Sequence, residues 1–110
     1  MKYKIALTQQ ADTDLRGIYE YIGFTLLEPE LATRQLERIE NAILSLDEMP
    51  KRFRIFEKEP WHSRGLCQMS VDNFSIFYIP NDKDKKVTII RVMYGGRDID
   101  EQLKKTDYKS

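Results

Sequence analysis

The chain has 110 residues, of which 41% are hydrophobic and 33% are charged, a composition typical of one compact domain and too short for two. No apolar run approaches the roughly 18 residues needed to span a bilayer, and the first residues lack the apolar region of a signal peptide. A single cysteine and a single histidine exclude an internal disulfide and a multi-histidine metal site. We therefore expect a cytoplasmic protein without a membrane segment, metal or other cofactor.

Charge is unevenly distributed although the formal net charge is zero. Residues 9–48 contain nine acidic and three basic side chains, a net charge of −6, and the rest of the chain carries +6. The basic half could face a phosphate backbone or an acidic protein. It could equally be ordinary solvated charge, and composition leaves both interpretations open.

The N-terminal pattern predicts a short strand followed by a helix. Residues Lys2–Leu7 alternate, which would place Tyr3, Ile5 and Leu7 on one face. Thr8 is a suitable N-cap, and acidic residues follow it in the first turns. The predicted helix runs to about Leu27 and has one apolar stripe. The stripe consists of Leu15, Ile18, Tyr19, Ile22 and Leu26.

A second amphipathic helix is predicted after the break at Glu28-Pro29-Glu30. Proline suits the first turn of a helix because that position needs no hydrogen-bond donor, and Pro50 lies just beyond the other end. The short connection predicts an antiparallel helix hairpin whose stripes face a common core. The second stripe consists of Ala32, Leu36, Ile39, Ile43 and Leu46.

Residues 51–63 lack periodicity and are predicted to form a loop or an irregular edge strand. Basic and aromatic side chains alternate there, with Trp61 expected in the core or covering an edge and His62 expected on the surface. The basic residues are either a solvated loop or a contact site for nucleic acid or another target. They are Lys51, Arg52, Arg54 and Lys58.

Three strands are predicted to follow as a meander. Residues Leu66–Val71 and Phe74–Ile79 flank Asp72-Asn73, a pair that tolerates positive φ and favours a tight hairpin. The β-branched run Val87–Tyr94 is the last strand, and the lone thiol of Cys67 is expected to be buried.

The C-terminal part is predicted to form a short helix. Asp98 and Glu101 have the spacing of a capping box, so we expect a helix from Ile99 to about Lys105. Residues Thr106–Ser110 are expected to be flexible. The whole order predicts an α+β fold in one domain, 1–110: an N-terminal strand, an antiparallel helix hairpin, then a three-stranded antiparallel meander packed on the helices, and a short C-terminal helix.

Several segments in this order resemble the RelE/ParE toxin superfamily, and the resemblance covers nearly the whole chain. The segment "TQQADTDLRGIYEYI" looks like the family's first helix, with its Ala-x-x-Asp-Leu and Ile-x-x-Tyr-Ile patterns. "SLDEMPKRF" looks like the family's helix end before a proline and a basic residue. "DNFSIFYIPNDKDKKVTIIRVMYGGRDI" resembles the hairpin whose last strand ends Arg-Val-x-x-Gly-x-Arg-Asp.

The resemblance implies the toxin of a type II toxin–antitoxin, or plasmid stabilisation, module. Such toxins are held inactive by a cognate antitoxin in a hetero-oligomer; a homo-oligomer also stays possible. When free, RelE-like members cut mRNA on the ribosome, whereas ParE-like members bind and poison DNA gyrase without cutting anything. A degenerate, non-toxic member that acts as a binding module is the third alternative.

The candidate catalytic residues, if the chain is a metal-independent endoribonuclease, are Arg97, Tyr94, Arg91 and Arg64. Where RelE has basic residues on the strand before the hairpin tyrosine, Tyr78, this chain has the uncharged Leu66, Gln68 and Ser70.

Some relatives have a catalytic histidine near the end of the last strand, where this chain has Met93. Tyrosine and arginine are poor general bases at neutral pH, because their pKa values lie near about 10 and above 12. This pattern argues against ribonuclease activity.

The ending "RVMYGGRDI" is more similar to the ParE branch, with Tyr94 where that branch commonly has a histidine. We therefore favour a gyrase-binding toxin that is not an enzyme, with Lys51, Arg52, Arg54, Lys58 and Arg97 as target contacts. We expect the last strand to present Arg91, Tyr94 and Arg97 to a macromolecule. In the structural alternatives, Arg91 pairs with an acid on the helix hairpin, Tyr94 packs half-buried on the sheet, and Arg97 and Asp98 form an ion pair beside a helix cap.

Overall fold

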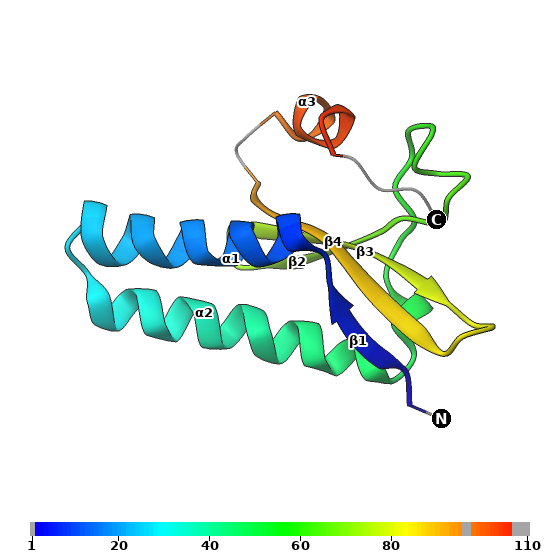
Figure 1. Cartoon of the computed structure of the whole chain (residues 1–110), viewed down its shortest axis with the longest axis horizontal. Helices are drawn as coiled ribbons and strands as arrows, with labels where there is room; N and C mark the ends of the chain where they lie inside the picture. The colour runs from blue at the N-terminus through cyan, green and yellow to red at the C-terminus, as the bar shows by residue number, and fades with distance from the viewer. Residues whose placement is uncertain (1, 96–97, 107–110) are drawn as a thin grey trace.

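The computed structural model describes residues 2–95 and 98–106 and has the predicted α+β architecture (Figure 1). In chain order its elements are β1 (Lys4–Leu7), α1 (Gln9–Glu20), the π-helical turn η1 (Tyr21–Thr25), α2 (Pro29–Leu44), the 3-10 turns η2 (Ser45–Asp47) and η3 (Pro50–Arg52), β2 (Cys67–Val71), β3 (Phe74–Asn81), β4 (Lys86–Tyr94) and α3 (Ile99–Lys104). The helix hairpin and the strand meander are both confirmed.

The four strands form one mixed sheet in the order β1-β4-β3-β2. Strands β2, β3 and β4 are the predicted antiparallel meander. Strand β1 lies parallel to β4, with Ile5 opposite Val87. The N-terminal strand therefore extends the sheet beside the last strand, and α1 begins directly at that edge (Figure 1).

Thr8 caps α1 as predicted and also ties the helix to the sheet. Its Oγ1 accepts a hydrogen bond from Ala11 N at 3.0 Å and donates one to Ile90 O at 2.9 Å. One hydroxyl thus satisfies an otherwise unpaired helix N–H and fixes where α1 leaves the edge of the sheet.

The first helix ends differently from the predicted stripe. In η1, Leu26 N donates to Tyr21 O at 3.0 Å, which is an i to i−5 bond. The extra residue in this turn rotates the next residues by roughly 100° about the helix axis. Leu26 is therefore exposed, and its predicted place in the core is wrong. Leu7, at the end of the edge strand β1, is also exposed, whereas Ile5 is partly buried against the core.

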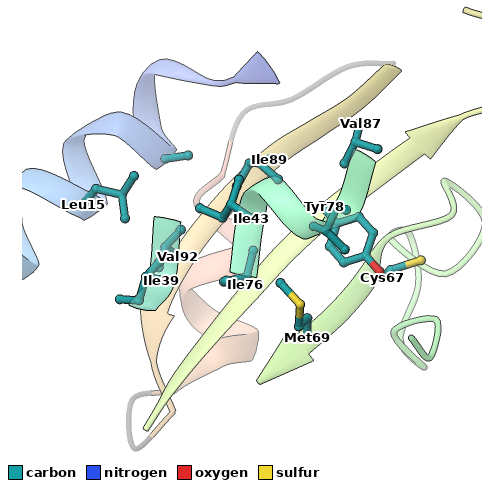
Figure 2. Packing of buried hydrophobic residues seen from close by; sticks show 12 residues of the cluster. Leu15, Ile39, Ile43, Cys67, Met69, Ile76, Tyr78, Val87, Ile89 and Val92 are labelled. Atoms are coloured by element: carbon teal, nitrogen blue, oxygen red, sulfur yellow. The ribbon is translucent and has the colours of Figure 1, made fainter. Parts of the chain in front are cut away.

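One main core lies between the helix hairpin and the sheet. Figure 2 shows Leu15 of α1 with Ile39 and Ile43 of α2 among side chains of the sheet. Tyr78 is fully buried there, and its hydroxyl donates to Pro50 O at 2.6 Å. Burial raises the pKa of Tyr78, so the hydroxyl remains a donor at neutral pH.

A second core covers the opposite face of the sheet. It is made by residues of the 53–66 loop, β3, β4 and α3, and Trp61 is buried in it as predicted. Its buried members are Trp61, Leu66, Phe77, Ile79, Ile90, Met93 and Leu103. The sheet is therefore covered on both faces, whereas the sequence analysis placed packing on one face only.

The turn between β2 and β3 also packs against a helix. Asp72 has the predicted positive φ, 55°, and its carboxylate accepts from Arg38 Nε at 2.7 Å and Arg38 Nη2 at 2.8 Å. Gln35 Nε2 adds a third bond at 3.0 Å. These bonds lower the pKa of Asp72, the one from Arg38 contributing most, and they join the turn to α2.

Two smaller expectations concern Cys67 and the C-terminal end. Cys67 is buried as expected, and burial raises the pKa of its thiol. Thr106, expected in the flexible end, is instead buried, and its Oγ1 donates to Gln102 O at 2.9 Å. Residues 107–110 lie outside the described residues.

The Tyr78 hydroxyl gives a direct test of the main core. Tyr78→Phe leaves the Pro50 carbonyl without its donor, so we expect the free energy of unfolding to fall by about 1–2 kcal/mol. Urea unfolding monitored by circular dichroism measures the change. Tyr21→Phe, at an exposed position, is the matched control and should change stability by less than about 0.5 kcal/mol. Equal effects of the two substitutions would contradict this account.

Candidate functional site

A β-bulge in β4 sets the direction of the side chains at its centre. Phe77 of β3 lies opposite Arg91, whereas Tyr78 lies opposite Ile89, so Ile90 is an extra residue on β4. Such bulges bend a strand and redirect the side chains beside them. Arg91 follows the extra residue directly.

Arg91 is held by Asp14 of α1 in a largely buried, bidentate ion pair. Its Nε lies 2.7 Å from Asp14 Oδ2 and its Nη2 lies 2.9 Å from Asp14 Oδ1. The two side chains are only 12% and 14% exposed. Two parallel N–H···O bonds in this planar geometry are the strongest form of such a pair.

The same pair reaches two further elements of the protein. Asp14 Oδ2 also accepts from Val92 N at 2.9 Å, which satisfies a backbone donor beside the bulge. Arg91 Nη1 donates to Thr106 Oγ1 at 3.0 Å, just beyond α3. The first helix, the last strand and the end of the C-terminal helix therefore meet at one charged cluster.

Arg91 is engaged by Asp14 and Thr106, and its contact with a macromolecule stays a prediction. Each of its three nitrogens donates to Asp14 or Thr106, so the guanidinium is oriented into the protein. The alternative, that Arg91 pairs with an acid on the helix hairpin, is confirmed. A cation bound in this way would have to leave a largely buried partner before it could bind a phosphate.

Tyr94, at the end of β4, remains accessible. It is 49% exposed, and its ring packs edge-on against Phe74 with 5.8 Å between the ring centroids. Tyr94 therefore packs half-buried on the sheet, as its structural alternative predicts. Its contact with a partner stays a prediction. Arg97 lies outside the described residues, whereas Asp98 caps α3 by accepting from Glu101 N at 3.3 Å.

Arg64 lies on the opposite face of the sheet from the helix hairpin. Its guanidinium stacks over the ring of Trp61, with Cζ 5.0 Å from the ring centroid. The two residues line an open pocket of about 450 Å³ between the loop and α3. Phe56, Leu103 and Thr106 contribute to the pocket walls, and Lys58, Asp100 and Lys104 add charge.

The four basic residues of the loop have different surroundings. Lys51 pairs with Asp82 and Lys58 with Asp100, and these hydrogen bonds raise the pKa of both lysines. Arg52 donates to Glu48 O at 2.6 Å and so caps the end of the helix hairpin. Arg54 is exposed, and its carbonyl accepts from Gln68 N at 3.0 Å.

The candidate catalytic residues that the structure describes have separate partners. Arg91 binds Asp14, Tyr94 packs on Phe74 and Arg64 stacks on Trp61. Leu66, just before β2, is buried, and Gln68 of β2 donates to Ser75 Oγ at 3.3 Å, so neither supplies a cation.

Asp14 is the residue of this cluster whose role the sequence analysis missed. The sequence predicts it only as an acid near a helix start, although it lies on the same helix face as Ala11 and Ile18. A carboxylate on an apolar stripe needs a buried partner, and that was the available signal.

Neither a metal site nor a membrane-spanning helix is found in the described part of the chain. Among these residues, no group of three or more His, Cys, Asp or Glu side chains is placed to hold a metal ion. Within residues 2–95 and 98–106, no helix is long and apolar enough to cross a membrane.

The sequence matches a known protein family over most of its length. The family described as "ParE toxin of type II toxin-antitoxin system, parDE" matches residues 5–99. The chain therefore belongs to this family and is the toxin of a type II toxin–antitoxin system. No curated protein sequence matches it significantly.

Solved structures of toxins have the same fold. A chain of the chromosomal ParDE system from P. aeruginosa superimposes with a TM-score of 0.70 at 21% identity, covering 84% of this chain and 96% of that one. The RelBE2 toxin–antitoxin complex from Mycobacterium tuberculosis gives 0.61 at 20% identity, with 86% and 99% covered. A mutant of the E. coli toxin RelE in the free state gives 0.63 at 16% identity, with 96% and 98% covered. Because the matched family consists of toxins from toxin–antitoxin systems, a cognate antitoxin is the partner that the family assigns to this chain.

The buried ion pair predicts a large effect on stability. Asp14→Ala leaves Arg91 buried without its counter-charge, so we expect the free energy of unfolding to fall by about 3 kcal/mol. Asp12→Ala removes an exposed pair with Arg16 in the same helix and should cost about 0.5 kcal/mol or less. Urea unfolding of both variants measures the difference. If the two substitutions destabilised the protein equally, the structural role of the pair would be refuted.

Proposed function

We propose that this toxin, when free of its antitoxin, arrests growth by binding DNA gyrase and is not a ribonuclease. The observation that carries the proposal is the engagement of Arg91 by Asp14 and Thr106. Arg91 is one of the candidate catalytic cations, and it lies on the last strand in the described part of the chain.

The chemistry of RNA cleavage supports this choice. A 2′-hydroxyl must lose a proton, the phosphate transition state must be stabilised, and the leaving oxygen must be protonated, so a base, cations and an acid must converge. The described candidates Arg64, Arg91 and Tyr94 include no group that is a natural base at neutral pH. His62 lies in the exposed loop, 3.9 Å from Glu59, and not on the last strand.

The basic residues are proposed to contact the target and its DNA. Gyrase works on DNA, so a toxin bound to it meets phosphate groups as well as protein. The loop cations are exposed and suited to phosphate contact, which is strongly salt-dependent. The proposed contacts are Lys51, Arg52, Arg54, Lys58 and Arg97.

The family matched and one of the related structures are of the ParDE type, which favours the same branch. In this proposal the antitoxin forms a hetero-oligomer with the toxin and blocks its access to gyrase. The toxin then acts in the cytoplasm and needs no cofactor of its own.

Two assays on the purified toxin test the proposal. We expect the toxin to inhibit DNA supercoiling by gyrase and to leave mRNA intact when ribosomes are present. Tyr94→Phe should keep full supercoiling inhibition, because no proton transfer by this hydroxyl is required.

The alternatives give different results in the same assays. Ribosome-dependent mRNA cleavage that Tyr94→Phe abolishes would identify a RelE-like endonuclease and refute the proposal. A chain that affects neither gyrase nor mRNA, and does not arrest growth when induced, would be a degenerate binding module.

A further inference from the structure

The connection between α1 and α2 carries an unusual concentration of exposed apolar side chains. It lies at the end of the helix hairpin farthest from the sheet, at the left of Figure 1. We define the hairpin tip by its exposed apolar residues. They are Tyr21 (56% exposed), Phe24 (70%), Leu26 (49%), Leu27 (79%) and Leu31 (46%).

The inner side of the hairpin tip is already closed by packing. Ile22, Gly23 and Ala32 are buried, and a Cβ built on Gly23 would lie 3.6 Å from Ala32 Cβ. The two helices therefore meet closely through small residues. The larger side chains outside this contact have no place left in the core and face solvent.

The backbone of the hairpin tip is arranged so that these side chains point outward. The π-turn rotates Leu26 away from the stripe that it would otherwise continue. Leu27 has a φ of 57°, a conformation that bulky residues rarely adopt. Both features work against stability. Exposure of this apolar surface therefore points to a binding role and not to a role in folding.

The charged side chains of the hairpin tip itself are all acidic, and Arg16 and Arg34 lie one helical turn further along α1 and α2. Residues 20–31 contain the glutamates Glu20, Glu28 and Glu30 and no lysine or arginine. Carboxylates repel nucleic acid, so an RNA or DNA phosphate backbone does not fit this surface. Its complement is an apolar recess with a basic rim.

We infer that the hairpin tip is a target-binding surface that inserts into an apolar, basic-rimmed recess of a DNA-handling protein. This inference rests on the proposed function and deepens it, since an enzyme that holds DNA presents lysines and arginines near its DNA path. The tip supplies the aromatic side chains Tyr21 and Phe24, the kind of anchor that dominates binding energy when it fills a pocket, and its leucines add apolar contact area. The basic loop then faces the DNA, and the acidic tip contacts the protein.

The shape of the hairpin tip favours such a target over the antitoxin as the occupant. A protruding apolar knob fits a recess in a larger folded protein. A flexible segment that wraps a toxin is instead bound by a groove along helices or by an open strand edge. The hairpin tip is also too small for the large interface of a stable inhibitory complex.

The test uses the full-length toxin and variants at exposed positions. Phe24→Ser/Leu27→Ser removes two apolar anchors of the tip, and Leu44→Ser, an exposed leucine of α2 outside the tip, is the matched control. For each protein we would measure growth arrest on induction, supercoiling inhibition of gyrase, affinity for the cognate antitoxin and thermal unfolding. The tip variant should inhibit gyrase at least about 10-fold more weakly and lose growth arrest, with unfolding and antitoxin affinity unchanged. The control should behave as wild type.

A charge variant tests the acidic rim separately. In Glu20→Gln/Glu28→Gln/Glu30→Gln, inhibition of gyrase should weaken at low salt and depend less on salt than in the wild type. An unchanged salt dependence would contradict the proposal that the recess in the target has a basic rim.

Several outcomes would overturn the inference. One is a tip variant as active as Leu44→Ser. Another is a tip variant that arrests growth but no longer binds antitoxin, because the tip would then be a binding surface for the antitoxin. If the wild type left gyrase untouched while its growth arrest still required the tip, the gyrase proposal would fail and the tip would stand as the surface for another target.

Discussion

The ion pair between Asp14 and Arg91 is the contact on which the arrangement of this toxin depends. It joins α1 to β4 in a largely buried setting, satisfies the Val92 N–H beside a β-bulge, and reaches Thr106 after α3. Because a buried charge without its partner is costly, each side chain of the pair fixes the other in place. Together with Thr106, the pair engages all three nitrogens of the Arg91 side chain.

The molecule has two regions with different surface properties. The basic loop and the covered second face of the sheet lie on one side, with a pocket lined by Trp61 and Arg64. The helix hairpin extends away from the sheet and exposes apolar and acidic residues at its tip. The two surfaces differ in charge and hydrophobicity, so they suit partners of different chemistry.

Much of the fold could be predicted because its signals are local. The apolar stripe of α2, the Asp72-Asn73 turn and the caps Thr8 and Asp98 depend on short-range periodicity or turn chemistry. The π-turn that exposes Leu26, the parallel placement of β1 and the second core around Trp61 depend on long-range packing, which no local pattern encodes. The same limit applied to the candidate site, where Arg91 was recognised but the partner that occupies it was not.

The central claim is that Arg91 acts through Asp14 in holding the structure and does not act on a substrate. The most direct measurement is growth arrest by Asp14→Asn/Arg91→Gln, in which neutral amides replace the charges and the new asparagine side chain can still accept from Val92 N. The account predicts that this double variant folds, binds antitoxin and arrests growth like the wild type. A variant that folds and binds antitoxin but no longer arrests growth would contradict the account, because the positive charge of Arg91 would then be needed at the target.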